Sequence, residues 1–424
     1  MVEDRKPSQP FAKGRGNDFC RGCHGRNLFS ALDLGDLPLA NELLLSKEDV
    51  IERFPLHLRV CQDCGLGQVA DVVTPERIFR DYRYLSSISS TFLEHAETFV
   101  AERVKEAMFA PGDWVLEIAS NDGYLLKNFL KLQIKAVGVE PAENVAALSR
   151  AIGIETISDF FSSHLAKELI QDRGYPKLII ANNVMAHVPD LDDFLKGLKV
   201  LCGPETKISI ENPSLSNILM EMQFDTIYHE HYSYLSAFAV ARLGALHGLH
   251  LNKVERLPIH GGSNRYWLSI STRDALVDTS VDTMIEFELT NGLFDSCTWD
   301  SYSRRVSEVL ENFVVWLRET KKLNRKVYGY GAAAKASTIL NTIGIDTDLI
   351  LAVADASLEK QGRFMPPHGI EIISPKTLYF EQPTDVIIFP WNISREIASI
   401  LRENLGKQTR LWCAIPVLHE IEVS

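Results

Sequence analysis

The chain contains 424 residues, more than one compact hydrophobic core usually holds, so its length predicts two or three domains. Hydrophobic residues make up 46% and charged residues 24%, a composition that excludes a disordered or fibrous chain. The formal net charge of -12 opposes broad electrostatic adhesion to nucleic acids or anionic lipids.

Nothing in the sequence indicates insertion into a membrane. No window approaches the roughly 18–20 consecutive apolar residues of a span, and residues 1–17 lack the apolar core of a signal peptide. Four of the seven cysteines form two tight pairs, which suits metal binding in a reducing compartment better than disulfide bonds. We therefore expect a cytoplasmic protein.

The predicted elements begin with a segment of about 75 residues that shows little long apolar periodicity and needs a staple. After residue 101, short apolar segments alternate with helical stretches, one of them at residues 124–132. This alternation predicts an α/β fold with a parallel sheet and helices on both faces. The predicted strands of this part are residues 114–118, 136–140, 177–181 and 207–211.

Residues 301–321 carry apolar side chains at intervals of three and four, which predicts one helix linking into a last domain. The stripe is Val306, Val309, Leu310, Phe313, Val314 and Leu317. Beyond it, strands at 326–330, 349–353 and 385–389 and a helix at 331–340 predict a second, smaller α/β unit. We expect domains at residues 1–75, 76–310 and 311–424.

Two Cys-x-x-Cys pairs predict a metal site in the first segment. Cys20 and Cys23 form one pair, and Cys61 and Cys64 form the other. Four thiolates close the tetrahedral shell of a zinc ion and leave no open position, so the zinc should be structural. Four unliganded thiols and a nucleic-acid-binding zinc ribbon are the alternatives, and the acidic balance argues against the second.

Residues 115–123 read as a strand, a polar turn and a helix start, the place where open parallel sheets bind nucleotides. Glu140 ends the next strand and can accept hydrogen bonds from ribose hydroxyls. The turn lacks Gly-x-Gly-x-x-Gly, which favours S-adenosylmethionine over NAD, although a purely structural turn stays open. The candidate cofactor-binding residues are Glu117, Asn121, Asp122, Gly123, Glu140, Asp159 and Phe160.

Together these segments resemble the zinc-containing sugar C-methyltransferases that act on nucleotide-linked 4-keto deoxysugars in antibiotic biosynthesis. The resemblance spans nearly the whole chain, with Ala119 standing where the family commonly has glycine. It implies a zinc module, a central methyl-donor domain and a C-terminal Rossmann-like domain, with the sugar nucleotide between the last two. Besides the cysteine pairs, it rests on residues 116–123, Asn183-Val-Met-Ala-His-Val-Pro-Asp190, Phe224-Asp-Thr-Ile-Tyr-His-Glu-His231, His260-Gly-Gly-Ser-Asn-Arg265 and Tyr328-Gly-Tyr-Gly-Ala-Ala-Ala-Lys335.

Carbon methylation beside a ketone needs a base for the acidic proton and a stabilised enolate oxygen. The resemblance implies His231 as base, Glu230 to orient it or to accept from the sugar, and Tyr228 as a polar contact. It also implies that His187 faces the sugar and stabilises the oxyanion, and that Tyr82 lies at the active site. In an extended strand Glu230 and His231 would point apart, so we predict an irregular loop.

Other readings of these residues stay open. Each histidine could be structural, and His229, His231 and His260 could form a second metal site. Lys335 and Tyr330, in the turn after the strand at 326–330, could meet a pyrophosphate, or this turn could hold NAD in an oxidoreductase. Arg265 could contact a carbonyl or phosphate, or form an ordinary ion pair.

The sequence thus predicts an S-adenosylmethionine-dependent C-methyltransferase with structural zinc. Its expected substrate is a dTDP-linked 4-keto deoxysugar, methylated next to the keto group at C-3. Methylation at C-5, a non-sugar keto substrate and a non-catalytic zinc scaffold are the alternatives. We expect no nucleic-acid or membrane partner, and a monomer or a weak homo-oligomer.

Overall fold

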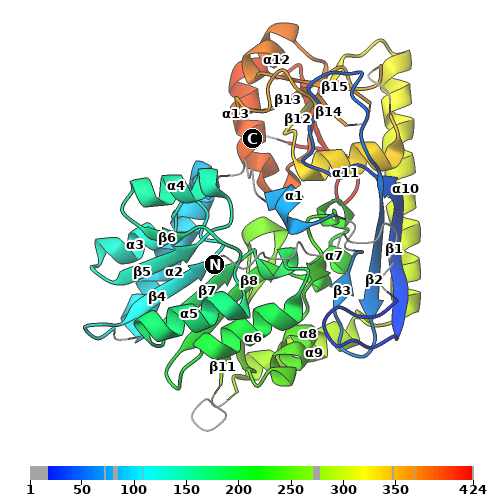
Figure 1. Ribbon diagram of the computed structural model, residues 1–424. Coiled ribbons are helices and arrows are strands. Elements are labelled where there is room, and N and C mark those ends of the chain that lie inside the picture. Colours follow the sequence, from blue (N-terminus) through cyan, green and yellow to red (C-terminus); the bar gives the residue numbers. More distant parts are fainter. Residues whose placement is uncertain are drawn as a thin grey trace.

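The computed structural model describes residues 18–70, 73–79, 85–107, 109–270, 277–345, 348–366 and 368–422. This part of the chain folds as an α/β protein around three β-sheets (Figure 1). A small antiparallel sheet contains the N-terminal strands, and a mixed sheet forms the middle. A second mixed sheet contains the C-terminal strands.

The middle sheet has the strand order β10-β11-β8-β7-β4-β5-β6. The strands from β6 to β8 run parallel, and β11 and β10 extend the sheet in the antiparallel direction. The strand order reverses at β4, and ligands bind at the carboxyl ends of strands at such a point. The strands are β4 (Trp114–Ile118), β5 (Lys135–Val139), β6 (Glu155–Ile157), β7 (Leu178–Asn182), β8 (Lys207–Pro213), β10 (His250–Leu257) and β11 (Ser263–Ser269).

Neighbouring residues of the middle strands face two separate cores, because side chains alternate along a strand. Val115 packs in the core that holds α2 and α3, whereas Leu116 packs in the core that holds α5, α6, α8 and α9. Helices therefore cover both faces, as predicted. The helices are α2 (Ser90–Ala107), α3 (Leu126–Lys131), α4 (Glu143–Ala151), α5 (Ser163–Arg173), α6 (Leu191–Leu201), α7 (Leu215–Met220), α8 (Ala237–Leu246) and α9 (Thr279–Thr290).

The N-terminal sheet has the order β1-β2-β3-β9 and is antiparallel throughout. We expected its segment to lack an apolar core, and this expectation is wrong. Leu32 and Leu58 are buried in one core with Phe313 of the long helix α10 (Ser296–Lys322). The elements are β1 (Leu28–Leu37), β2 (Phe54–Cys61), β3 (Gly67–Gln68), β9 (Ser233–Tyr234) and the short helix α1 (Pro75–Phe79).

The C-terminal sheet has the order β14-β15-β13-β12-β16-β17-β18, with antiparallel strands only at its two edges. The predicted strand at 349–353 is much shorter, and the helix after β12 begins three residues later than predicted. The elements are β12 (Val327–Tyr330), α11 (Ala334–Ile343), β13 (Val353–Ala354), β14 (Phe364–Met365), β15 (Ile370–Ile373), α12 (Pro375–Glu381), β16 (Asp385–Ile388), α13 (Ser394–Leu405), β17 (Arg410–Cys413) and β18 (His419–Glu420).

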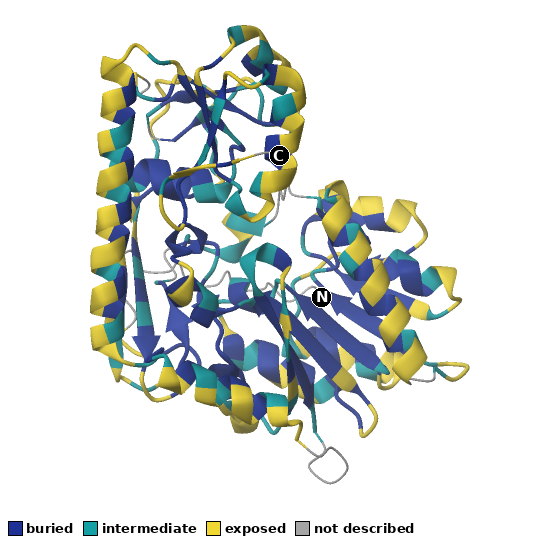
Figure 2. Cartoon of the chain, turned by 180° about the vertical axis from the view of Figure 1, so that it is seen from behind, coloured by how far each residue is buried: buried dark blue, intermediate teal, exposed yellow. Residues whose placement is uncertain are grey.

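Helix α10 runs beside β1 and β2 and reaches the C-terminal sheet (Figure 1). Its predicted apolar stripe is confirmed, since Val306, Val309, Phe313 and Leu317 are all buried. Figure 2 shows the same division elsewhere, with buried strands inside and exposed outer faces on the helices. In the described ranges, no helix is both long and apolar enough to cross a membrane.

Candidate active site

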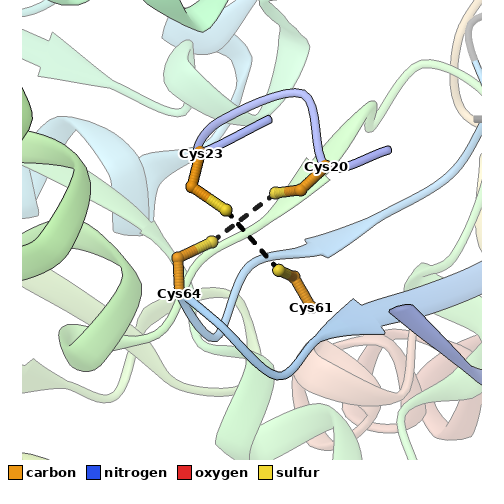
Figure 3. A group of neighbouring side chains, drawn as sticks. All are labelled: Cys20, Cys23, Cys61 and Cys64. Carbon is orange, nitrogen blue, oxygen red and sulfur yellow. Dashed lines mark hydrogen bonds between the residues drawn. The ribbon is translucent and has the colours of Figure 1, made fainter. Parts of the chain in front are cut away.

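The four paired cysteines converge at one point of the N-terminal module, which we define as the described residues from 18 to 75 (Figure 3). The Sγ atoms of Cys20 and Cys64 lie 3.5 Å apart, and those of Cys23 and Cys61 lie 3.7 Å apart. Sulfur atoms around tetrahedral zinc lie about 3.8 Å apart when each bond is about 2.3 Å, so the cluster fits zinc.

The histidines near the cysteines have other partners. His24 Nε2 lies 2.7 Å from a carboxylate oxygen of Asp192, and His57 Nε2 lies 2.7 Å from Ser30 Oγ. These contacts agree with the prediction that the four sulfurs form the ligand set.

A tight turn follows β4, and we call residues 119–123 the donor turn. Ala119, Asn121 and Gly123 all adopt positive φ angles, of 56°, 49° and 78°. A Cβ atom on Gly123 would lie 2.3 Å from Ile154 Cδ1, so this position needs glycine for space as well as conformation. The Glu140 carboxylate stabilises the turn by accepting hydrogen bonds from the backbone N–H groups of Asn121 and Ala142.

Negative charge is concentrated beneath the donor turn. Glu117 is buried, its Oε2 atom has no hydrogen-bond partner, and its pKa is raised well above the usual value by burial and then by Asp122 and Glu140. Asp122 Oδ1 and Asn182 Oδ1, from the end of β7, are also buried without partners. Unsatisfied acceptors of this kind fit a ligand that carries positive charge and donates hydrogen bonds, as S-adenosylmethionine does.

A short segment before α2 contacts the donor turn. The backbone N–H groups of Ser86 and Ser87 donate to Asn121 Oδ1 and Asp122 Oδ2, at 2.9 and 3.2 Å. Tyr82, which we placed at the active site, lies outside the described residues.

The remaining two candidate cofactor residues follow β6 at the far side of the donor turn. The side chain of Asp159 is exposed and accepts a hydrogen bond from the Phe160 backbone N–H, whereas Phe160 is half-buried. Neither residue contacts the donor turn directly through a hydrogen bond among the described residues. Their roles in binding the donor stay predictions.

Residues 228–232, which we call the His-Glu-His loop, form an irregular turn, as predicted. The ring of His231 lies 4.1 Å from the ring of Tyr228 and 4.7 Å from the ring of His187, measured between centroids. His187 ends the short 3-10 turn Met185–His187, just after β7, and β7 pairs with β4. The structure therefore brings Tyr228, His187 and His231 together next to the strand that carries the donor turn.

The hydrogen bonds of His187 and His231 fix which ring nitrogen carries the proton. His231 Nδ1 lies 3.0 Å from the Thr226 carbonyl oxygen, and His187 Nδ1 lies 2.8 Å from the Glu230 carbonyl oxygen. A carbonyl oxygen only accepts, so Nδ1–H donates in both rings and each neutral imidazole keeps a lone pair on Nε2.

Burial keeps both imidazoles neutral. It lowers the pKa of His187 to about 4 and, together with the nearby His187, lowers the pKa of His231 well below its usual value. A neutral imidazole with a lone pair on Nε2 can take up a proton, which is what a base requires.

The Glu230 side chain points away from His231. Its Oε1 accepts a hydrogen bond from Asn41 Nδ2 at 2.7 Å, and burial raises its pKa to about 7. The contact that orients His231 is instead the Thr226 carbonyl. Of the two roles that we considered for Glu230, accepting from the substrate is compatible with this arrangement, whereas orienting His231 is not.

The C-terminal part reaches the same region through Lys335 and Trp391. Lys335 Nζ lies 4.9 Å from the centre of the Trp391 ring, and Trp391 Nε1 donates to Asp225 Oδ2 at 2.8 Å. Burial raises the pKa of Asp225 to about 6, against the opposing effect of the Lys335 charge. Sequence reasoning missed Asp225 and Trp391, although Asp225 lies in the same quoted motif as His231.

The other two candidate substrate residues differ in environment. Arg265 is buried in an ion pair with Glu211, 2.6 Å from its carboxylate, and this geometry favours the ion-pair reading over a phosphate contact. Tyr330 ends β12 and is half-buried. His229 Nε2 donates to the Phe54 carbonyl oxygen at 3.1 Å, which accounts for this ring without a second metal.

Three family models match the chain: a zinc binding domain at residues 20–79, a methyltransferase domain at 92–254 and a C-methyltransferase C-terminal domain at 258–416. The C-methyltransferase NovU from Streptomyces niveus is 31% identical over 401 residues, which cover 94% of this chain and 96% of NovU.

Two solved structures were also matched. One is a protein from Pyrococcus horikoshii OT3, with 14% identity, coverage of 46% of this chain and 97% of that chain, and a TM-score of 0.34. The other is the magnesium protoporphyrin IX methyltransferase from Synechocystis PCC 6803, with 11% identity, coverage of 42% and 83%, and a TM-score of 0.33. At these scores neither structure carries an argument.

The three matched domains stand in order along the chain, and NovU is matched over nearly its whole length. The cysteine cluster fits zinc, and the donor turn fits a positively charged donor. The chain therefore belongs to the zinc-containing, S-adenosylmethionine-dependent C-methyltransferases.

Proposed function

We propose that the substrate is a dTDP-linked 4-keto deoxysugar and that the methyl group is attached at C-3, the carbon next to the keto group. The motifs that resemble the sugar C-methyltransferases support this substrate class. The observation that carries the proposal is the pair of neutral imidazoles, His187 and His231, beside the strand of the donor turn.

In this proposal His231 is the base. Its Nε2 lone pair takes the proton from the carbon beside the carbonyl group, and the electron pair of the broken C–H bond forms the enolate. S-adenosylmethionine, when bound, supplies the electrophilic methyl group that the enolate carbon takes up. The Thr226 carbonyl holds the His231 ring, and it stabilises the protonated imidazole by accepting from Nδ1–H.

The enolate oxygen needs a hydrogen-bond donor. We expected His187 in this role, but a neutral His187 has its proton on Nδ1 and can only accept at Nε2. We therefore assign the donor role to the Tyr228 hydroxyl group. His187 Nε2 accepts a hydrogen bond from a hydroxyl group of the sugar, and so does the Glu230 carboxylate.

The nucleotide is proposed to lie against the C-terminal part. The backbone N–H groups at the start of α11 and the Lys335 ammonium group suit a pyrophosphate, and Tyr330 ends the preceding strand. Because Arg265 is held in its ion pair, we assign it to the scaffold of the site. The domain limits at 75 and 310, a monomer or weak homo-oligomer and a cytoplasmic location complete the proposal.

The decisive test replaces the proposed base. We expect His231→Asn to bind S-adenosylmethionine as the wild type does, while methyl transfer falls about a hundredfold or more, the scale of a lost general base. Calorimetry measures donor binding, and radiolabelled donor measures transfer to a dTDP-linked 4-keto deoxysugar. His164→Asn is the matched control, because the His164 side chain is 81% exposed.

Two further readouts fix the chemistry. The wild type should exchange the substrate proton at C-3 with solvent deuterium, and His231→Asn should exchange it much more slowly. The product made with a ¹³C-labelled methyl group shows by NMR which carbon received it. Transfer to C-5 or to a simple ketone would contradict the proposed substrate position, and full turnover by His231→Asn would contradict the proposed base.

A further inference from the structure

The His-Glu-His loop is held by the N-terminal module, which comes from the other end of the chain. Asn41 Nδ2 donates to Glu230 Oε1 at 2.7 Å. His229 Nε2 donates to the carbonyl oxygen of Phe54, at the start of β2. Tyr232 donates its hydroxyl group to the carbonyl oxygen of Val73 at 2.8 Å. Alternate contacts along the loop thus come from one module, and only the contact to Glu230 is made by a side chain of the module.

The backbone around Asn41 is fixed on both sides. Leu39 and Ala40 are buried just after β1, and Glu42 forms an ion pair with Arg77 at 2.9 Å. Two residues further on, the backbone of Leu44 pairs with Phe364 in the C-terminal sheet. Asn41 therefore lies on a segment with defined coordinates, and its amide is directed at the loop by the chain on either side.

Glu230 depends on this amide. The carboxylate is 6% exposed, and Asn41 is its hydrogen-bond partner within the described part of the chain. Burial raises the pKa of Glu230 to about 7, and the hydrogen bond from Asn41 opposes that rise. A buried carboxylate with a single donor has one orientation while that donor is present and several when it is absent.

We propose that Asn41 is a positioning residue, whose amide fixes the Glu230 carboxylate so that its other oxygen, Oε2, accepts a hydrogen bond from a hydroxyl group of the substrate. The N-terminal module thereby contributes a side chain to the active site, in addition to holding zinc. This inference rests on the proposed function, because Glu230 contacts the substrate only there.

The test is a double-mutant cycle between the two residues. Asn41→Asp keeps the volume of the side chain but replaces the donor by a carboxylate, and we expect kcat to fall about tenfold or more, because a hydrogen bond to a charged group is lost. Asn41→Ala should lose less, and Asn41→Gln, which keeps an amide, should recover part of that loss. The Kd for S-adenosylmethionine should stay at the wild-type value in all three variants.

The cycle separates positioning from general destabilisation. With Glu230→Gln already in place, adding Asn41→Ala should change kcat by less than about twofold, because the two residues act through one hydrogen bond. Asn27→Ala is the matched control from the same module, since the Asn27 amide only contacts the exposed Asp63 at 3.4 Å. Zinc content and far-UV circular dichroism show whether each variant is folded.

The outcomes distinguish the two proposals. A wild type that does not methylate the sugar nucleotide contradicts the proposed function and leaves the contact between Asn41 and Glu230 without a reaction to serve. A wild type that does, together with wild-type kcat in Asn41→Asp, overturns the role of Asn41. Equal losses from Asn41→Ala with and without Glu230→Gln also overturn it, as do equal losses in Asn41→Ala and Asn41→Gln, and these comparisons hold if Asn41→Asp does not fold.

Discussion

Three histidines around the active site share one physical property. Burial lowers the pKa of His187, His229 and His260 to about 4 in each case, so all three stay neutral at neutral pH. The sequence identified these histidines but not their tautomers, because Thr226 and Phe54, whose carbonyls bind two neighbouring rings, are unremarkable in sequence. A role that depends on which nitrogen holds the proton requires coordinates.

The pKa of buried His229 makes stability depend on pH. In the unfolded chain a histidine takes up its proton near pH 6.5, whereas folded His229 takes it up only near pH 4. Between these values the unfolded chain binds more protons, so the free energy of unfolding falls as the pH falls. At 1.36 kcal/mol per pKa unit, the full shift is worth roughly 3 kcal/mol.

We therefore expect His229→Gln, which keeps a donor for Phe54 but does not titrate, to lose less stability than the wild type from pH 7 to about pH 5. Urea unfolding at each pH measures the difference, and the exposed His164→Asn is the control. Parallel pH dependence in the wild type and His229→Gln would contradict a neutral, buried His229.

At the scale of elements, β9 connects the metal site to the His-Glu-His loop. Gly67 and Gln68 of β3 pair with Tyr234 and Ser233 of β9, and β3 follows Cys64 by three residues. The loop ends where β9 begins. The cysteine ligands and the sheet that anchors the loop are therefore neighbours in both sequence and space.

Loss of zinc should accordingly loosen the His-Glu-His loop as well as the cysteine pairs. We expect a chelator or Cys64→Ser to increase amide hydrogen exchange in peptides that cover residues 228–234, while the strands of the middle sheet stay protected. Cys297→Ser is the control, because Cys297 is exposed and lies outside the cluster. Unchanged exchange at 228–234 after complete zinc loss would contradict this connection.

The sequence predicted the middle and C-terminal α/β units well, because their buried strands are short apolar runs with helices between them. It failed for the N-terminal sheet. Leu32 and Leu58 lie in strands that are apolar on one face only, and the partner of that face, α10, is more than 200 residues away. A local pattern does not show a distant partner, so the segment read as one without a core. The contact of Asn41 with Glu230 escaped for the same reason.

At the scale of the whole molecule, one aromatic side chain joins the C-terminal part to the active-site region. Trp391 donates to Asp225 and packs on Gly261, whose added Cβ would lie 2.2 Å from the ring. Gly261 has a φ of 80°, so both its conformation and its lack of a side chain serve this contact.

Gly261→Ala should therefore displace Trp391 and weaken binding of the sugar nucleotide. We expect KM for that substrate to rise several-fold, while the Kd for S-adenosylmethionine changes little. Gly35→Ala is the matched control, because Gly35 also has a positive φ, of 76°, but no atom within 4 Å of an added Cβ. Both variants carry the backbone strain of about 1–2 kcal/mol, so the difference between them measures the steric effect alone. Equal KM values in the two variants would refute a role for this contact in substrate binding.

The shared core around α10 has a consequence for engineering. Leu37 near one end of the chain and Ile415 near the other pack in the same core, whereas the middle sheet has cores of its own. A chimaera that exchanges only one end between relatives would place foreign side chains against native ones in a close-packed interior. Both ends must be transplanted as a matched pair, and the middle can then be replaced as a cassette.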